Sequence, residues 1–340
     1  MKYTDNAINV ITANTYKGVG KAWINQRLKY SQSVETIVSL LNNNLKQEKL
    51  ITIEDFVFYK NQIINQIEKF QDSCDGLVAI GDKNFPKYKE GVKESERPIF
   101  LFYKGNISLL DIEYSRITVI GLLNPDEKIE IREQKIVTEI VKNDIIIVSG
   151  LAFGCDSIAH KQALIGGKTI AILPSALNNI MPAKNKSLAF EIVEEGGLLI
   201  TEYYDEHKSA MDLFSRYKDR DRLQALFCDA IILAASYAED TAERWKMFGQ
   251  KLDSGARLGM GFAKNYNIPR AVMYDQKLDV DNPMFDLNRQ LISESKDITI
   301  LTQKSLEELI SKVKSKVKSK NAFQSDLFVS KFKDENNTGT

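Results

Sequence analysis

The stretch Asp144-Ile145-Ile146-Ile147-Val148-Ser149-Gly150-Leu151-Ala152-Phe153-Gly154 decides the fold class of this 340-residue chain. Its apolar first half predicts a buried strand, and the residues that follow it open a helix that carries Ala163 and Leu164. Gly150 and Gly154 allow a tight turn and let a ligand approach main-chain N–H groups closely. Because the N-terminal end of a helix favours an anion, the stretch predicts a phosphate-binding loop at the carboxyl end of a strand.

Two interpretations of this loop remain open. Its glycines lack the spacing of both G-x-G-x-x-G and the P-loop, and many α/β proteins have a similar turn that binds no phosphate. Asp156 is either the N-cap of the helix or a ligand contact. His160 follows one helical turn later, so its ring either bonds to Asp156 or faces the same ligand.

From Gly76 onward, short β-rich runs alternate with helical ones. The expected strands are 117–121, 145–148, 169–173, 198–201, 230–234 and 270–274. The expected helices are 127–142, 157–165, 187–195, 221–227 and 255–266. This alternation predicts right-handed βαβ units and therefore an α/β fold, with a parallel sheet covered by helices on both faces.

The first 75 residues predict a small helical domain. Residues 34–45 and 53–70 carry apolar side chains at three- and four-residue spacing. Between two helical patterns, Gly18-Val19-Gly20 is either the hairpin of a helix-hairpin-helix module, in which backbone amides contact a DNA phosphate, or an ordinary turn between helices. We therefore divide the chain into a helical domain (1–75), a sheet domain (76–303) and a tail (304–340).

Composition limits the classes of function. Lys plus Arg equals Asp plus Glu at 46 each, so any nucleic-acid site must be local rather than a global basic field. Three cysteines, Cys74, Cys155 and Cys228, match no metal-ligand spacing and favour a reducing cytoplasm. No apolar run reaches the length of a membrane span, and the N-terminus has no apolar leader segment. We expect a cytoplasmic protein without a metal site.

The order of motifs resembles the DNA-processing protein A (DprA/Smf) family. The family pattern S-G-x-A-x-G-x-D-x-x-A-H is complete from Ser149 to His160. Further segments that resemble family motifs follow one another in the family's order: Arg97–Gly105, Gly166–Leu173, Met181–Leu188, Leu199–Glu202, Asp253–Ala256 and Asn288–Ile292. The resemblance implies an extended Rossmann-like fold preceded by a helix-hairpin-helix or SAM-like domain.

The resemblance also implies a function in DNA recombination and transformation. Members bind single-stranded DNA and hand it to the RecA recombinase, form homodimers, and are not known as enzymes. A homodimer would use elements after about residue 225. We expect no cofactor, because this function needs phosphate-binding amides, cations and aromatic faces rather than a nucleophile. The candidate DNA- or phosphate-binding residues are Gly18, Gly20, Gly150, Gly154, Asp156, His160, Lys168, Lys184, Arg216, Lys218, Arg220 and Arg222, with Tyr203, Tyr204, Phe214 and Tyr217 as stacking candidates.

The chain departs from the family pattern in ways that leave the ligand open. Where members carry G-S-R after the first strand of the Rossmann-like fold, this chain has Gly121-Leu122-Leu123-Asn124. The family's R-N-R becomes Arg220-Asp221-Arg222, which adds a carboxylate that opposes a phosphate. Residues 237–245 resemble an insertion, and the winged-helix module of many members is absent. A nucleotide-binding sensor or processing protein on the same scaffold, for example in anti-phage defence, and a scaffold for protein partners remain alternatives.

The tail carries a candidate last helix over residues 305–313, and it combines a basic repeat with a short apolar motif. Residues 311–320 alternate Lys with Ser or Val, which is typical of a solvated, disordered segment. Gln324-Ser325-Asp326-Leu327-Phe328 resembles the peptide that bacterial proteins insert into the sliding clamp, with Leu327 and Phe328 as apolar anchors and Gln324 at a second site. The alternative is an ordinary tail with an isolated Leu-Phe pair.

Overall fold

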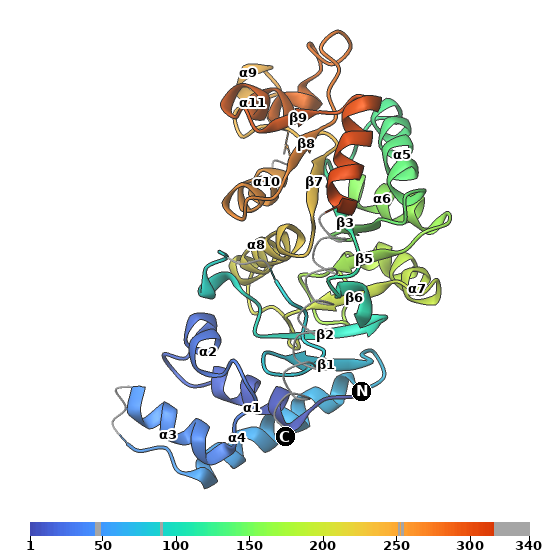
Figure 1. The fold of residues 1–340 in the computed structure, drawn as a ribbon. Coiled ribbons are helices and arrows are strands. Elements are labelled where there is room, and N and C mark those ends of the chain that lie inside the picture. Colours follow the sequence, from blue (N-terminus) through green and yellow to red (C-terminus); the bar gives the residue numbers. More distant parts are fainter. Residues whose placement is uncertain (45–48, 89–90, 251, 253–254, 316–340) are drawn as a thin grey trace, which may run out of the picture.

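The structure, a computed structural model, contains a mixed sheet of nine strands within the residues that it describes (Figure 1). The model describes residues 1–44, 49–88, 91–250, 252 and 255–315. The strand order is β1-β2-β6-β5-β4-β3-β7-β8-β9. Only β2 runs antiparallel to its neighbours β1 and β6, and the other pairs are parallel. The strands are β1 (Gly76–Ala79), β2 (Phe100–Gly105), β3 (Arg116–Ile120), β4 (Ile146–Ser149), β5 (Thr169–Ile172), β6 (Leu198–Thr201), β7 (Ala230–Leu233), β8 (Arg270–Val272) and β9 (Ile298–Ile300).

Helices cover both faces of the sheet, because its central strands are apolar on both sides (Figure 1). On one face Val119 packs with Val137 and Ile140 of α5. The next residue, Ile120, points to the other face and packs in a core that includes Met260 of α10. The predicted α/β Rossmann-like fold is thus confirmed. The helices from α5 onward are α5 (Glu127–Val141), α6 (Cys155–Leu164), α7 (Lys186–Glu194), α8 (Ala210–Leu226), α9 (Thr241–Arg244), α10 (Ala256–Asn265) and α11 (Asp286–Glu294).

Four helices precede the sheet and lie beside its β1 edge (Figure 1). They are α1 (Asp5–Asn14), α2 (Lys21–Arg27), α3 (Val34–Asn44) and α4 (Ile53–Ile67). A capping box between Thr52 and Asp55 starts α4. Ile8 and Ile11 of α1 belong to the same apolar core as Phe100 and Phe102 of β2. The helical segment and the sheet therefore share one continuous core, and the domain boundary near residue 75 stays a prediction.

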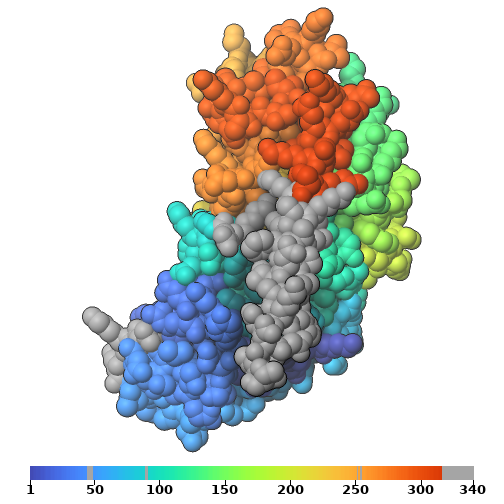
Figure 2. Space-filling view, in the orientation of Figure 1, coloured from blue at the N-terminus to red at the C-terminus, as the bar shows by residue number. Residues whose placement is uncertain are grey.

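The chain after β9 continues into the last helix that the sequence predicts over residues 305–313. Residues 303–315 form a helix. Its Leu306, Leu309, Ile310 and Val313 are buried in the core of the α5 face, so the disorder predicted for the basic repeat is wrong for residues 311–315. Figure 2 shows this helix near one end of an elongated molecule and α1–α4 as a lobe at the other. The peptide with Gln324, Leu327 and Phe328 lies outside the described residues.

Within the described part of the chain, no helix is both long and apolar enough to cross a membrane.

Candidate nucleic-acid interface

A pocket of about 410 Å³ opens at the carboxyl ends of the central strands. The chain leaves β3 toward β4 on one side and leaves β7 toward β8 on the other, so a crevice forms between β3 and β7. Ile120 and Gly121 at the end of β3 form its floor region, and the loop after β4, the helix α8 and the start of α10 form its walls. We call this the switch-point pocket.

The glycine loop beside the switch-point pocket already holds an anion, the carboxylate of Asp156. The amides of Gly150 and Ala152 both donate to Oδ2 of Asp156, each at 3.2 Å. Leu151 between them has a φ of 57°, which turns the two N–H groups toward one point. Burial raises the pKa of the Asp156 carboxyl, although the Arg220 guanidinium opposes the shift. The amides of Gly150 and Ala152 in the loop that was predicted to bind a phosphate are therefore already engaged within the protein.

Both glycines of the loop are needed because protein atoms approach them closely. Gly154 has a φ of 65° and occupies the N-cap position of α6, so Asp156 is not the N-cap. A Cβ at Gly154 would lie 2.2 Å from the carbonyl oxygen of Leu122. A Cβ at Gly150 would lie 2.7 Å from Nη1 of Arg220. The close approach expected of a ligand is thus made by the protein itself.

His160 does not reach the switch-point pocket. Its ring is fully buried, and Nδ1 lies 2.7 Å from Oγ1 of Thr169 in the core. Since Thr169 donates its own hydrogen to the carbonyl of Ile147, Nδ1 of His160 donates to Thr169. Burial lowers the pKa of His160 from 6.5 to about 3. The predicted contact of His160 with Asp156 or with a ligand is therefore wrong.

The two lysines predicted outside α8 lie at opposite ends of the sheet. Lys168 precedes β5, at the amino end of the strand, and its Nζ donates to the carbonyl of Glu195. Lys168 is thus far along the strand from the edge that bears the pocket, which corrects its assignment. Lys184 is exposed and precedes Asn185, whose amide donates to the carbonyls of Leu151 and Ala152. Lys184 therefore stands beside the glycine loop.

The helix α8 separates the remaining predicted cations onto two faces. Ser209 caps its start by accepting from the amide of Asp212, so α8 begins well before the predicted 221–227. Residues three or four apart share a helix face. The pocket face carries Phe214, Tyr217, Lys218, Arg220, Asp221 and Gln224.

On the pocket face, Arg220 is already paired. Its Nη2 lies 2.6 Å from Oδ1 of Asp221, and its Nη1 lies 3.9 Å from Oδ2 of Asp156. The guanidinium also lies 5.2 Å from the ring centre of Tyr217. Lys218, in contrast, is an exposed side chain on the pocket wall. Lys218 is consequently the more available cation for a phosphate.

On the opposite face of α8, Arg216 and Arg222 are buried in ion pairs. Arg216 pairs with Asp205 at 2.9 Å and with Asp212 at 3.2 Å. Arg222 pairs with Glu202 at the end of β6 and with Asp219 at 3.3 Å. Both guanidinium groups are buried and occupied by these ion pairs on the side of α8 away from the pocket, and this corrects the predicted DNA contact of both arginines.

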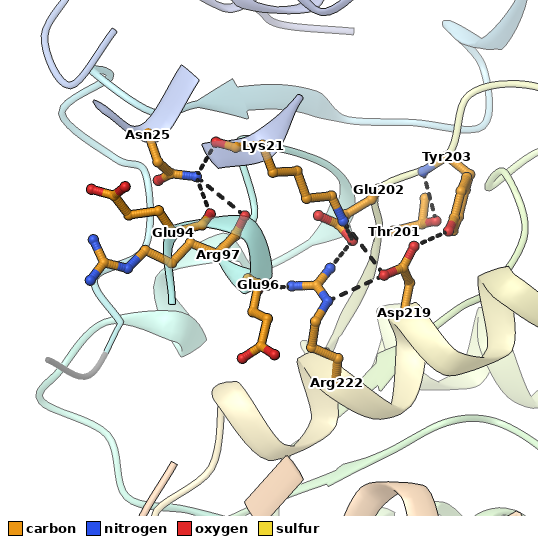
Figure 3. Close-up of polar contacts among 10 residues, drawn as sticks. All are labelled: Lys21, Asn25, Glu94, Glu96, Arg97, Thr201, Glu202, Tyr203, Asp219 and Arg222. Atoms are coloured by element: carbon orange, nitrogen blue, oxygen red, sulfur yellow. Dashed lines mark hydrogen bonds and ion pairs between the residues drawn. The ribbon is translucent and has the colours of Figure 1, made fainter. Parts of the chain in front are cut away.

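The Arg222 cluster extends to the helical segment (Figure 3). Lys21, the first residue of α2, pairs with Glu202 at 3.0 Å and with Asp219 at 3.6 Å. In Figure 3 Lys21 and Arg222 approach the two carboxylates from different elements. We call Lys21, Glu202, Asp219 and Arg222 the α2–α8 ion cluster. It holds α2 against β6 and α8.

The predicted hairpin lies directly before this cluster. Gly18 has a φ of 89°, and Gly20 is the N-cap residue of α2. A Cβ at Gly20 would meet no atom within 4 Å. The role of Gly18 and Gly20 in DNA binding stays a prediction.

Exposed apolar side chains surround the pocket. Leu123, Phe153, Phe214 and Leu258 all line it, and all four are exposed. Of these, sequence reasoning named Phe214 as a site residue, while Phe153 lay unassigned inside the recognised motif. Leu123 and Leu258 give no signal in the sequence. The predicted stacking residues Tyr203 and Tyr204 lie elsewhere, since Tyr203 donates to Asp219 and Tyr204 packs on Phe100 and Phe102.

The fold and the site define an α/β protein with a pocket at the switch point of a Rossmann-like sheet. Residues 76–242 match the family model of DNA recombination-mediator protein A. This segment, just under half of the chain, belongs to the DNA-processing protein A (DprA/Smf) family. The family is one of DNA recombination mediators.

Individual relatives agree with this assignment. Protein Smf of Borreliella burgdorferi is 29% identical over 174 residues, which cover 51% of this chain and 53% of the relative. DprA of Streptococcus pneumoniae is 33% identical over 140 residues, covering 41% and 47%. The chain thus spans about half the length of the curated relatives it matches.

Solved structures of the family share the fold. The crystal structure of DprA from Streptococcus pneumoniae superimposes with a TM-score of 0.65 at 21% identity, covering 91% of this chain and 99% of that one. A structure of DprA from Helicobacter pylori, which concerns that protein's single-stranded DNA binding mode, gives a TM-score of 0.54 at 23% identity, covering 70% and 95%.

Proposed function

We propose that this chain is a recombination mediator that binds single-stranded DNA across the switch-point pocket. The observation that carries the proposal is the group of exposed apolar side chains, Leu123, Phe153, Phe214 and Leu258, around a pocket at the carboxyl edge of the sheet. Unpaired bases stack on aromatic rings such as those of Phe153 and Phe214 and pack against apolar side chains beside them. In a duplex the faces of the bases are covered by their neighbours. Binding rather than catalysis is the proposed activity.

In this proposal the phosphates contact the exposed lysines, because the amides of the glycine loop already donate to the carboxylate of Asp156. Lys218 stands on the pocket wall and Lys184 beside the loop. Arg220, which is paired with Asp221, contributes to the shape of the pocket more than to its positive charge. This places the backbone at the rim and the bases over the apolar walls.

We further propose, from family membership, that the bound strand is passed to a RecA-type recombinase in recombination or transformation. A homodimer through elements after residue 225 belongs to the same proposal. The tail peptide with Gln324, Leu327 and Phe328 is proposed as a sliding-clamp ligand, in agreement with its apolar anchors.

The salt dependence of binding tests the function. Anisotropy of a labelled single strand should show an affinity that falls with salt, with a log–log slope of about 0.7 for each phosphate contact. Lys218→Ala and Lys184→Ala should each flatten this slope, because each removes an exposed cation. Lys168→Ala, at the other end of β5, is the matched control and should leave the slope unchanged. Equal slopes in all four proteins would reject the proposed path of the backbone.

A free nucleotide is the second candidate ligand. A pocket volume of about 410 Å³ falls in the range of small-molecule sites. Calorimetry with nucleoside monophosphates separates the two candidates: a nucleotide sensor binds the monomer tightly without DNA, whereas the proposed mediator needs several linked nucleotides for comparable affinity.

A further inference from the structure

The deep part of the switch-point pocket is poorly suited to a phosphate. Two carboxyl groups line it, those of Asp156 and Asp221, and both approach the single guanidinium of Arg220. The loop amides of Gly150 and Ala152 are engaged with Asp156. A phosphate at this depth would meet two carboxylates and would have to displace one of them.

The rest of the pocket suits a flat ring. Phe153 and Phe214 face it from the glycine loop and from α8, and Leu258 closes it from α10. Its volume of about 410 Å³ exceeds the space that a single nucleobase fills. A base that enters between these walls brings the polar edge of its ring to the carboxylate end of the pocket.

We propose that the switch-point pocket selects nucleobases that carry an exocyclic amino group, with Asp221 as the residue that determines this specificity. The proposal rests on the proposed binding of single-stranded DNA. A carboxylate accepts hydrogen bonds and donates none. Cytosine presents an amino donor at the position where thymine presents a carbonyl acceptor. Cytosine thus gains a charge-assisted hydrogen bond, and thymine places an oxygen against a carboxylate.

Homopolymers of deoxycytidine and thymidine, equal in length, provide the comparison, because both pyrimidines stack weakly and carry the same backbone charge. For the full chain we expect the Kd for the deoxycytidine polymer to be lower by about tenfold, the effect of one hydrogen bond to a charged group. A deoxyuridine polymer controls for the methyl group of thymine and should behave like the thymidine polymer.

Asp221→Asn tests the assignment to a residue, because its amide can donate to thymine. The variant should bring the ratio of the two Kd values close to one. Asp219→Asn is the matched control, since it removes the same charge from the opposite face of α8 and should keep the ratio. Leu258→Trp fills the pocket without touching the ion pairs and should also remove the discrimination.

The outcomes separate this proposal from the proposed function. Equal affinities of the unaltered chain for the two polymers, or an unchanged ratio in Asp221→Asn, would overturn the base selection while DNA binding stands. If neither polymer binds, the proposed function fails. Calorimetry with free deoxycytidine and thymidine then tests whether the pocket selects the base. A preference for deoxycytidine that Asp221→Asn removes then supports the selection, and no heat from either nucleoside overturns it.

Discussion

Asp156 and His160 lie one helical turn apart on α6, and each polar side chain has a partner inside the protein. Asp156 accepts from two amides of its own loop, and His160 donates to Thr169 in the core. The motif that contains them therefore builds the loop and anchors α6, while the side chains available to a ligand lie on neighbouring elements. The strand-glycine-helix pattern thus predicted the position of the pocket better than the side chains that line it.

The buried ring of His160 makes stability depend on pH. Its folded pKa of about 3 lies below the ordinary value of 6.5, so between these values the unfolded chain binds the extra proton. The contribution of His160 is fully present above pH 6.5 and is lost as the pH falls toward 3. The unaltered chain should lose up to about 1.4 kcal/mol of unfolding free energy per pH unit relative to His160→Asn, which keeps a donor and does not titrate. Denaturant unfolding from pH 7 to pH 4 measures this, and parallel curves for the two proteins would contradict it.

The helix α8 is the element whose length and orientation the sequence did not predict. Its charged residues follow no apolar period, so the pattern predicted a helix only from residue 221. Without a helix over these residues, the cations from Arg216 to Arg222 had the same predicted role in binding phosphate. Helical geometry instead directs Lys218 and Arg220 toward the pocket, while Arg216 and Arg222 form buried ion pairs. The partners in these pairs, Asp205 and Glu202, lie outside α8 and before it in the chain.

Because α8 has a buried face and a pocket face, one substitution on it should lower the unfolding free energy strongly and another should hardly change it. Arg222→Ala leaves the buried carboxylate of Glu202 without its arginine and should reduce the unfolding free energy by about 3–5 kcal/mol. Lys218→Ala removes an exposed side chain and should change it by no more than about 0.5 kcal/mol. Thermal or denaturant unfolding of both variants provides the comparison. A stable Arg222→Ala protein would show that the α2–α8 ion cluster contributes little to the unfolding free energy.

At the scale of the whole molecule, the sequence predicted the parallel core of the sheet because each central strand is a continuous apolar run followed by a helix. It did not predict β1 and β2 as strands, since β2 pairs with β6, which lies almost a hundred residues later in the chain, and β1 pairs with β2. Neither did it predict that Lys21 of α2 closes an ion cluster with α8. The pocket itself combines residues of β3, α8 and α10, and such long-range assembly leaves no local pattern to recognise.

Photo-crosslinking tests most directly whether single-stranded DNA binds at the switch-point pocket. A strand that contains 5-iododeoxycytidine is irradiated with the full chain, and the attached peptides are identified by mass spectrometry. We expect crosslinks to Phe153, Phe214 or Tyr217, the aromatic residues of the pocket, and we expect Leu258→Trp to remove them. Crosslinks confined to α1–α4, with none near the pocket, would contradict it.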